Sequence, residues 1–535
     1  MNTSVSTNTA EHAWRALDKH AERLRGAHTA ALFAADEARL PAFSVTHDGL
    51  YFDFSRQRLD APALAALLDL ADAARLPQGI EQLFGGARLN HTENRPALHM
   101  AMRDDALLPA NSDTDWAANR ERLLALTDAV RTGQLCGATG EPFAHILALG
   151  IGGSELGPRL VCEALAQPNA RTPQVRFVAG LDPAELTFAL AGAHPERTLV
   201  LIASKSWSTL ETLENARAVR QWLRSTLSEA QLAQHLVAIC SVPAQAHEFG
   251  VAAERIFPLP EWVGGRFSVW SAVGLPAMLA VGSDAFRALL AGAQAMDRHF
   301  RHAPFAQNLP VLAALIGLWN IHALNIETHA VLPYAHGLRS LPAWLQQLDM
   351  ESNGKRVTRD GTPVTLHSAP IVWGGAEPAG QHAFHQLLYQ GTRTAALDFL
   401  LVGNPHNHPM QRLLAECGIA QAAALMHGRS LDAARALLVQ QGKDPALAPH
   451  LVCPGNQPSS TLLLPALTPH HLGQLLAFYE HKIFVQGWLW GINSFDQFGV
   501  ELGKEMARAL HNTNRRPDPA ATALLTALAR SEGKA

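Results

Sequence analysis

The sequence predicts an α/β protein with two doubly wound, mainly parallel sheets, and two observations support this fold class. Apolar, β-type runs alternate with helical stretches, first in the middle of the chain and again in its second half. At 535 residues the chain is also too long for one ordinary hydrophobic core. Since regular alternation of strand and helix is typical of parallel sheets covered on both faces, we expect two such domains.

The predicted strands fall into two series. The first series lies between about residues 110 and 275 and comprises residues 145–150, 174–180, 198–204, 235–241 and 255–260. A long apolar helical region follows, and the second series comprises residues 329–334, 370–375, 395–403 and 460–468. The order of elements is similar in the two halves, although no residue-level repeat is visible. We therefore predict one domain at residues 106–275 and a second at 276–510.

The two ends of the chain differ from these domains. Residues 1–105 show helical apolar spacing, for example ALAALLDLADAA at 63–74, and no run of strand signals. We therefore expect a helical N-terminal extension. Residues 511–535 are polar and contain prolines before a short predicted amphipathic helix. This segment is predicted to be a peripheral C-terminal tail.

Composition narrows the possible functions. Hydrophobic residues make up 48% of the chain and charged residues 17%, as in globular proteins, and the formal net charge is −4. Charge therefore gives no reason to expect binding to nucleic acid or to an anionic membrane. The five cysteines are widely spaced, odd in number and without a C-x-x-C pair, which argues against a disulfide framework. The N-terminus lacks the basic start and apolar core of a secretory signal, so we expect a cytoplasmic protein.

Two other features favour ordinary structural interpretations. The most apolar stretch, residues 309–324, is interrupted by Pro310, Asn320 and His322, and is predicted to be a buried helix. The 26 histidines include no H-E-x-x-H motif, and the closest cluster, His406 and His408, lies in a loop-like sequence. We therefore expect scattered surface histidines and no metal site.

The predicted strand 145–150 leads into a glycine-rich segment, GIGGSELGP at 150–158. Glycines let backbone amides approach an anion closely, and Ser154 adds a hydroxyl donor. A dinucleotide motif would need glycine where Glu155 stands, and no glycine-lysine-serine/threonine triplet of a nucleotide P-loop follows. Considered alone, the segment is equally compatible with a tight turn that binds no ligand.

A second segment makes a phosphate site the better interpretation. The predicted strand 198–204 ends in SKSWST (204–209), which places four hydroxyls in six residues before a predicted helix. Hydroxyls, free amides and the positive end of a helix dipole suit a phosphate monoester. Serine and threonine also cap helices routinely, and Ser208 with Glu211 has capping-box spacing. We expect Ser208 to serve as the cap.

These two segments resemble the phosphate-binding segments of the glucose-6-phosphate isomerase family, which is built from two sugar isomerase (SIS) domains. Four further segments agree: VGGRFS (263–268), QQLDMESNGK (346–355), GQHAFHQLLYQGT (380–392) and GWLWGINSFDQFGVELGK (487–504). The matches occur in family order from residue 150 to residue 504. Departures include Glu155 for the usual Asp, SWS (206–208) for Thr-Phe-Thr, Leu210 for Gln, and GAEPAGQH (375–382) for G-P-G-T-N-G-Q-H.

The resemblance implies aldose-ketose isomerisation of glucose 6-phosphate and fructose 6-phosphate, in glycolysis and gluconeogenesis, through ring opening and a cis-enediolate. No cofactor is implied. Such chemistry needs a base, which can be a carboxylate whose pKa is raised by partial desolvation, and a cation beside the developing enediolate. The family match assigns the base to Glu351, the cation to Arg266, and ring opening to His382 and Lys504.

The same resemblance implies a set of substrate contacts and a partner. The predicted substrate-binding residues are Gly153, Ser154, Ser204, Lys205, Ser206, Thr209, Gln347 and Gln497. Of these, Gln497 is expected at the phosphate, and Gln347 could hold a sugar hydroxyl because it lies one helical turn from Glu351. The family further implies a homodimer in which the histidine enters the pocket of the neighbouring subunit.

Other interpretations stay open at this point. Without the family match, Glu351 and Lys504 would be solvated surface groups and Arg266 a partner in a salt bridge. A non-catalytic phosphosugar-binding regulator is one alternative function, but it would need no proton-transfer residues. An isomerase that also accepts mannose 6-phosphate is another.

Overall fold

The computed structural model describes residues 3–110, 112, 114–167, 172–510 and 518–532. The chain forms two compact units, Met1–Ser494 and Phe495–Ala535. All five cysteines are free thiols. No helix within the described ranges is long and apolar enough to cross a membrane.

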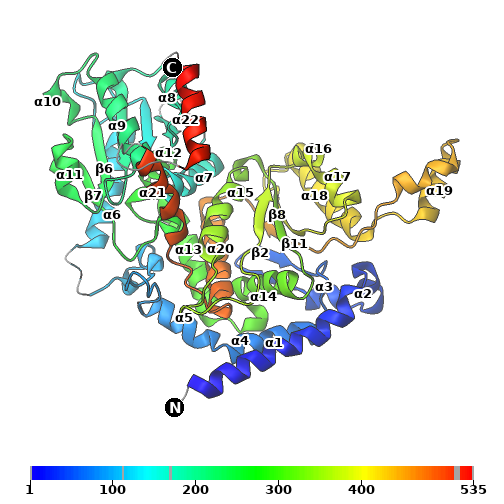
Figure 1. Ribbon diagram of the computed structural model, residues 1–535. Coiled ribbons are helices and arrows are strands. Elements are labelled where there is room, and N and C mark those ends of the chain that lie inside the picture. Colours follow the sequence, from blue (N-terminus) through cyan, green and yellow to red (C-terminus); the bar gives the residue numbers. More distant parts are fainter. Residues whose placement is uncertain (1–2, 111, 113, 168–171, 511–517, 533–535) are drawn as a thin grey trace. The chain divides into compact units, whose positions relative to one another are not determined.

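The first sheet has five parallel strands in the order β4-β3-β5-β6-β7. They are β3 (His145–Leu149), β4 (Gln174–Val178), β5 (Thr198–Ala203), β6 (Leu236–Cys240) and β7 (Ile256–Pro258). Of these, β6 and β7 are labelled in Figure 1. All five strands predicted in this half are confirmed. Every residue of β5 and β6 is buried, which explains the continuous apolar runs in the sequence.

The strand order of this sheet fixes where a ligand can bind. The chain passes from β3 outward to β4, then returns past β3 to β5 and continues in the opposite direction. Right-handed crossovers then place α7 (Leu156–Leu165) and α9 (Leu210–Leu223) on opposite faces of the sheet. The switch point therefore lies at the carboxyl ends of β3 and β5.

The second sheet has six strands in the order β1-β2-β11-β10-β8-β9. Its parallel members are β8 (Thr328–Tyr334), β9 (Ile371–Gly374), β10 (Ala396–Val402) and β11 (Ser459–Leu464), which confirms the four predicted strands. Their order, β9-β8-β10-β11, repeats the order β4-β3-β5-β6 of the first sheet. Two mainly parallel sheets of similar topology are therefore present, as the order of elements predicted.

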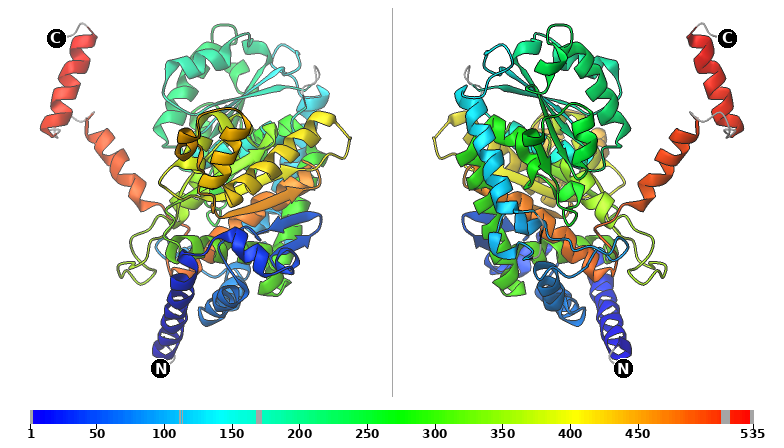
Figure 2. Two further views of the ribbon diagram at one scale, coloured as in Figure 1. Left: turned by 90° about the vertical axis from the view of Figure 1, so that its right-hand side faces the viewer. Right: turned by 90° about the vertical axis from the view of Figure 1, so that its left-hand side faces the viewer.

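A hairpin from the N-terminal region completes the second sheet. Strands β1 (Ser44–His47) and β2 (Leu50–Asp53) pair antiparallel, and β2 pairs antiparallel with β11 (Figure 2). The expectation of a helical extension is therefore wrong for residues 44–53. The two strands are too short to show alternation, but Asp48 and Gly49 have φ of 46° and 83°, as in the two-residue turns that favour Asp-Gly.

The other N-terminal elements are helical, as expected. They are α1 (Thr3–Arg25), α2 (Thr29–Ala35), α3 (Arg39–Ala42), α4 (Ala61–Ala73) and α5 (Leu76–Phe84). The helices between and around the strands are α6 (Trp116–Thr132), α8 (Pro183–Leu190), α10 (Glu229–Leu232), α11 (Pro243–Glu248), α12 (Leu275–Val281), α15 (Leu341–Leu345), α16 (Gly380–Ala383), α17 (His385–Gln390), α18 (Pro409–His427) and α19 (Leu431–Gln440).

Three long helices pack together, with α20 (Pro469–Leu489) in contact with both α13 (Ser283–His302) and α14 (Leu309–His322). The prediction of a buried helix at residues 309–324 is confirmed, since twelve of the fourteen residues of α14 are buried. Arg103 joins α13 to α20 through Asp297 (2.6 Å) and Glu480 (2.7 Å). Burial by itself would raise the pKa of Asp297, but the charges and hydrogen bonds of Arg103 and His481 have the larger effect and lower this pKa to about 2.

The second unit contains a 3-10 turn, η12 (Phe498–Val500), and the helices α21 (Glu501–Leu510) and α22 (Pro519–Ser531). The helix predicted at the end of the tail is confirmed as α22. The remaining part of the predicted tail, 511–517 and 533–535, lies outside the described residues. The domain boundaries at residues 105, 275 and 510 stay predictions, and the structural division falls between Ser494 and Phe495.

Candidate active site

Two loops meet at the switch point of the first sheet. Residues 150–154 follow β3, and residues 204–209 follow β5. The loops leave the same edge because Leu149 and Ile202 are register partners in neighbouring parallel strands. A Cβ on Gly150 would lie 3.4 Å from the Cβ of Ala203, so the bases of the two loops are in contact. The structure therefore brings the predicted phosphate-binding loops together where ligands bind in such sheets.

The hydroxyls of the second loop pair with one another. Ser204 Oγ donates to Thr209 Oγ1 (3.0 Å), and the hydroxyls of Ser206 and Ser208 are 2.6 Å apart. The expectation that Ser208 caps the helix is wrong, because α9 begins one residue later, with Thr209 as N-cap and without a side-chain cap bond. No hydroxyl of the loop therefore caps the first turn of α9. The backbone amides of this turn are left for an anion.

Lys205 points toward a different loop. Its Nζ donates to the main-chain oxygens of Glu261 (3.2 Å) and Val263 (3.1 Å). The side chain is half-buried, and burial lowers its pKa. Its ammonium group thus contacts the segment that immediately precedes Gly264, Gly265 and Arg266.

The glycine loop after β3 touches two other predicted parts of the site. A Cβ on Gly153 would lie 2.2 Å from the carbonyl carbon of Gly265 and 2.7 Å from the amide of Arg266, so only glycine permits this backbone contact. Gly152 has φ of 60°, and a Cβ there would lie 3.0 Å from Gln347 Nε2. The loop therefore packs on both the arginine segment, η6 (Gly265–Phe267), and the segment that carries Gln347.

Arg266 and Glu351 form an ion pair beside this loop. The distance from Arg266 Nη1 to Glu351 Oε2 is 3.3 Å, and the side chains are 2% and 21% exposed, respectively. Arg266 Nε donates to Ser352 Oγ (2.6 Å), and Nη2 donates to the main-chain oxygen of Ser494 (2.6 Å). Arg266 is thus fixed by two neutral acceptors as well, while the Glu351 carboxylate stays accessible.

Glu351 ends a short π-helix, η10 (Gln346–Glu351), that continues α15. Helical turns of this type occur often at functional sites. Gln347 belongs to the same turn, and its Oε1 is buried without a hydrogen-bond partner among the residues described. Since an unpaired buried acceptor is costly, this oxygen suits a ligand hydroxyl.

Two residues that the sequence analysis did not single out position this region. Ser352 and Ser494 accept the hydrogen bonds of Arg266, through a hydroxyl and a carbonyl respectively. Ser494 Oγ also donates to Asn353 Oδ1 (2.7 Å), and Asn353 Nδ2 donates to the main-chain oxygen of Ile483 (3.0 Å). The sequence signal that could have identified these two serines is their place within segments 346–355 and 487–504, which match the family.

Three further predicted site residues lie on other segments of the chain. His382 lies exposed on α16, and its side chain makes no hydrogen bond or ion pair to any residue that the structure describes. Gln497 and Lys504 belong to the second unit, where Gln497 precedes η12 and Lys504 Nζ pairs with Glu501 Oε1 at 2.7 Å. The approach of these three side chains to the site stays a prediction.

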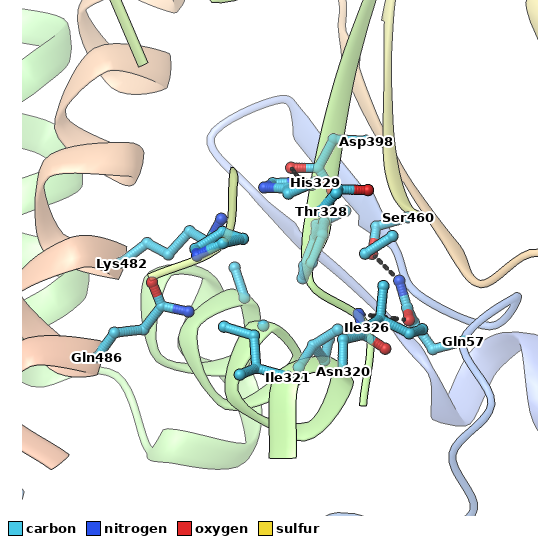
Figure 3. Close-up of a pocket in the computed structure, with 16 residues that line it drawn as sticks. Gln57, Asn320, Ile321, Ile326, Thr328, His329, Asp398, Ser460, Lys482 and Gln486 are labelled. Carbon is cyan, nitrogen blue, oxygen red and sulfur yellow. Dashed lines mark hydrogen bonds and ion pairs between the residues drawn. The ribbon is translucent and has the colours of Figure 1, made fainter. Parts of the chain in front are cut away.

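A small buried cavity lies elsewhere, near the amino ends of β8, β10 and β11 (Figure 3). Its lining includes His329, Asp398 and Lys482, and His329 Nε2 is 3.0 Å from Asp398 Oδ2. The volume of about 30 Å³ is that of a single water molecule, so a sugar phosphate does not fit. Within the described ranges, no group of three or more His, Cys, Asp or Glu side chains is arranged to hold a metal ion.

Comparison with known proteins decides the family. A sequence model of phosphoglucose isomerase matches residues 53–522, a range that includes every predicted site residue. The chain belongs to the phosphoglucose isomerase family. This family member is 56% identical over 523 residues to a glucose-6-phosphate isomerase of Aromatoleum aromaticum, with 97% of this chain and 96% of that protein covered.

Other relatives agree with this assignment. A glucose-6-phosphate isomerase of Hahella chejuensis is 44% identical over 517 residues, with 94% and 92% coverage. The crystal structure of a glucose-6-phosphate isomerase from Chlamydia trachomatis matches with a TM-score of 0.83 at 32% identity, covering 96% of this chain and 98% of that one. The likeness therefore extends over the whole fold of this family member.

The contact at Gly153 gives a direct test of the site geometry. Gly153→Ala should destabilise the protein by about 1–3 kcal/mol, because the added methyl forces the two backbones apart. Gly265→Ala is the matched control, since a Cβ there meets nothing within 4 Å. Urea unfolding of both variants measures the difference. Equal midpoints for the two variants would show that residues 153 and 265 are not in this close contact.

Proposed function

We propose that this chain interconverts glucose 6-phosphate and fructose 6-phosphate by proton transfer through a cis-enediolate, with Glu351 as the base. The observation that carries the proposal is the Glu351–Arg266 ion pair beside the glycine loop, because it sets a carboxylate next to a fixed cation. The names of the relatives and the family support the same reaction. A phosphosugar-binding regulator would have no use for this pair.

The phosphate group is assigned to the two loops of the first sheet. Its oxygens accept hydrogen bonds from the hydroxyls of Ser204, Ser206 and Thr209 and from Ser154, together with the Gly153 amide. These donors lie at a helix N-terminus, where a dianion is favoured. Gln497 is proposed to bind the same group. The phosphate thereby fixes one end of the substrate.

The other end of the sugar faces Glu351. Starting from the ketose, the carboxylate removes a proton from C1, and the C2 carbonyl becomes the enediolate oxygen. The C1 hydroxyl proton then passes to the C2 oxygen, and Glu351 delivers to C2 either its original proton or one exchanged from solvent, which leaves an aldehyde at C1. Arg266 stabilises the negative oxygen, because its charge is permanent and its side chain is already oriented. Gln347 holds a sugar hydroxyl through its unpaired Oε1. The reaction as written uses no metal or cofactor.

Ring opening is assigned to His382 and Lys504. A histidine exchanges protons near neutral pH, which suits transfer between the ring oxygen and a hydroxyl. Since His382 projects from the surface of its own chain, we place it in the active site of a second subunit. The free cysteines fit a cytoplasmic enzyme.

Substitution of Glu351 tests the proposed reaction. Glu351→Gln should lower kcat on the order of 10²-fold to 10⁴-fold, because it removes the basic carboxylate while keeping the size of the side chain. Binding of fructose 6-phosphate, measured by calorimetry, should persist. Glu248→Gln is the control, since Glu248 is exposed. Turnover close to that of the unmodified enzyme would remove Glu351 from the role of base.

Mixed subunits test the shared site. Glu351→Gln and His382→Ala should each be inactive alone, but the two refolded together should recover about a quarter of the normal activity. The reason is that half of the dimers are hybrids, and each hybrid contains one site with both native residues. Each variant refolded with itself is the control. A mixture no more active than its parents would place His382 and Glu351 in one subunit.

A further inference from the structure

Lys205 stands between two of the predicted phosphate ligands, yet its amine is engaged elsewhere. Ser204 and Ser206 flank it, and both hydroxyls bond within the loop after β5. Lys205 Nζ instead donates to the carbonyls of Glu261 and Val263, at 3.2 and 3.1 Å. An ammonium group has no acceptor capacity and three donors, so two of them are satisfied by main-chain oxygens.

The segment that Lys205 contacts connects β7 to Arg266. Residues 259–264 form no regular element, and their carbonyls are held by bonds from other parts of the chain. Ser241 Oγ donates to Leu259 O (3.0 Å), and Leu98 N donates to Trp262 O (3.0 Å). Lys205 supplies two more bonds of this kind, to the carbonyls of Glu261 and Val263 on either side of Trp262. We name residues 259–264 the arginine approach.

The main chain of Lys205 is itself anchored to the sheet. Lys205 O accepts a hydrogen bond from Ser241 N (2.9 Å), and Ser241 directly follows β6. The side chain therefore spans from a fixed point beside the phosphate loop to the arginine approach. At the far end of this approach, the Gly265 carbonyl packs against Gly153, and Arg266 begins its contacts with Glu351 and Ser352.

We propose that Lys205 is a positioning residue: it holds the arginine approach against the phosphate loop and thereby sets Arg266 beside the substrate, without contacting the phosphate. This inference rests on the proposed function. It separates two tasks within the six-residue loop, since the hydroxyls bind the phosphate and the lysine aligns the cation. If the amine moved onto a phosphate oxygen, both of its hydrogen bonds to the main-chain carbonyls would break, and the arginine approach would no longer be held.

The experiment compares turnover with phosphate affinity in Lys205→Met. Methionine keeps much of the apolar stem but has no ammonium. The variant should lose about 10-fold to 100-fold in kcat, because misplacement of a catalytic group by about 1 Å has effects of this size. The constant for competitive inhibition by inorganic phosphate should stay within about threefold, as expected for a partly screened charge that is not a ligand.

Two further variants complete the test. Lys205→Arg should recover part of the lost kcat, because a guanidinium can also donate to two carbonyls. Lys443→Met is the matched control, since Lys443 is exposed, and it should behave like the unmodified enzyme. If Lys205→Met does not fold, Lys205→Arg carries the comparison, with a lowered kcat and an unchanged phosphate constant as the expected result.

The opposite pattern, in which phosphate binding weakens and kcat is retained, would overturn the inference. A rise of about tenfold or more in the phosphate constant, with kcat retained, would make the amine a phosphate ligand. An unchanged kcat in both Lys205 variants would show that the arginine approach is positioned without the hydrogen bonds from Lys205. An unmodified enzyme with no isomerase activity would instead contradict the proposed function, so the two failures are distinguishable.

Discussion

The buried guanidinium of Arg266 is the contact on which the site depends. It joins η6 to Ser352 and Ser494, which lie 86 and 228 residues further along the chain. A buried cation is tolerated only where its donors are paired, so these acceptors are a condition for its presence. Because Arg266 is fixed in this way, the ion pair with Glu351 has a defined geometry, and η10 is held against the glycine loop.

The two similar sheets contribute different parts of the chemistry. In the first sheet, the loops after β3 and β5 supply the proposed phosphate ligands at the switch point. In the second sheet, the chain after β8 leads instead into α15 and η10, which carry Gln347 and Glu351. In the proposed reaction, the same strand order thus supports binding in one half and proton transfer in the other, because function resides in the loops. Gly153 is the point at which these parts touch.

The sequence predicted the strands well and the contacts poorly, for physical reasons. All nine predicted parallel strands are present, and those buried throughout, such as β5 and β6, were visible as continuous apolar runs. The hairpin at residues 44–53 was missed because it is short, although Asp48-Gly49 was a usable turn signal. The prediction that Ser208 caps α9 was wrong, because the helix begins one residue later and the Ser208 hydroxyl pairs with that of Ser206.

The contacts of the site depend on chain segments that sequence patterns cannot join. Periodicity places Gln347 near Glu351, but nothing local predicts that Arg266 meets a carbonyl at Ser494 or that Lys205 turns away from the phosphate loop. Family resemblance supplied the identities of Glu351 and Arg266, and the structure adds their ion pair and its supports. The positions of His382, Gln497 and Lys504 relative to Glu351 stay predictions that rest on the resemblance.

The central claim is that the reaction proceeds by proton transfer through an enediolate, and isotope labelling tests it most directly. Fructose 6-phosphate is converted in deuterated water, and the glucose 6-phosphate formed is examined for deuterium at C2 by NMR. A carboxylate base that exchanges with solvent predicts deuterium at C2, incomplete wherever the base returns its original proton first. Product that carries no solvent deuterium at C2, however slowly the enzyme is made to turn over, would contradict the account and favour a hydride shift.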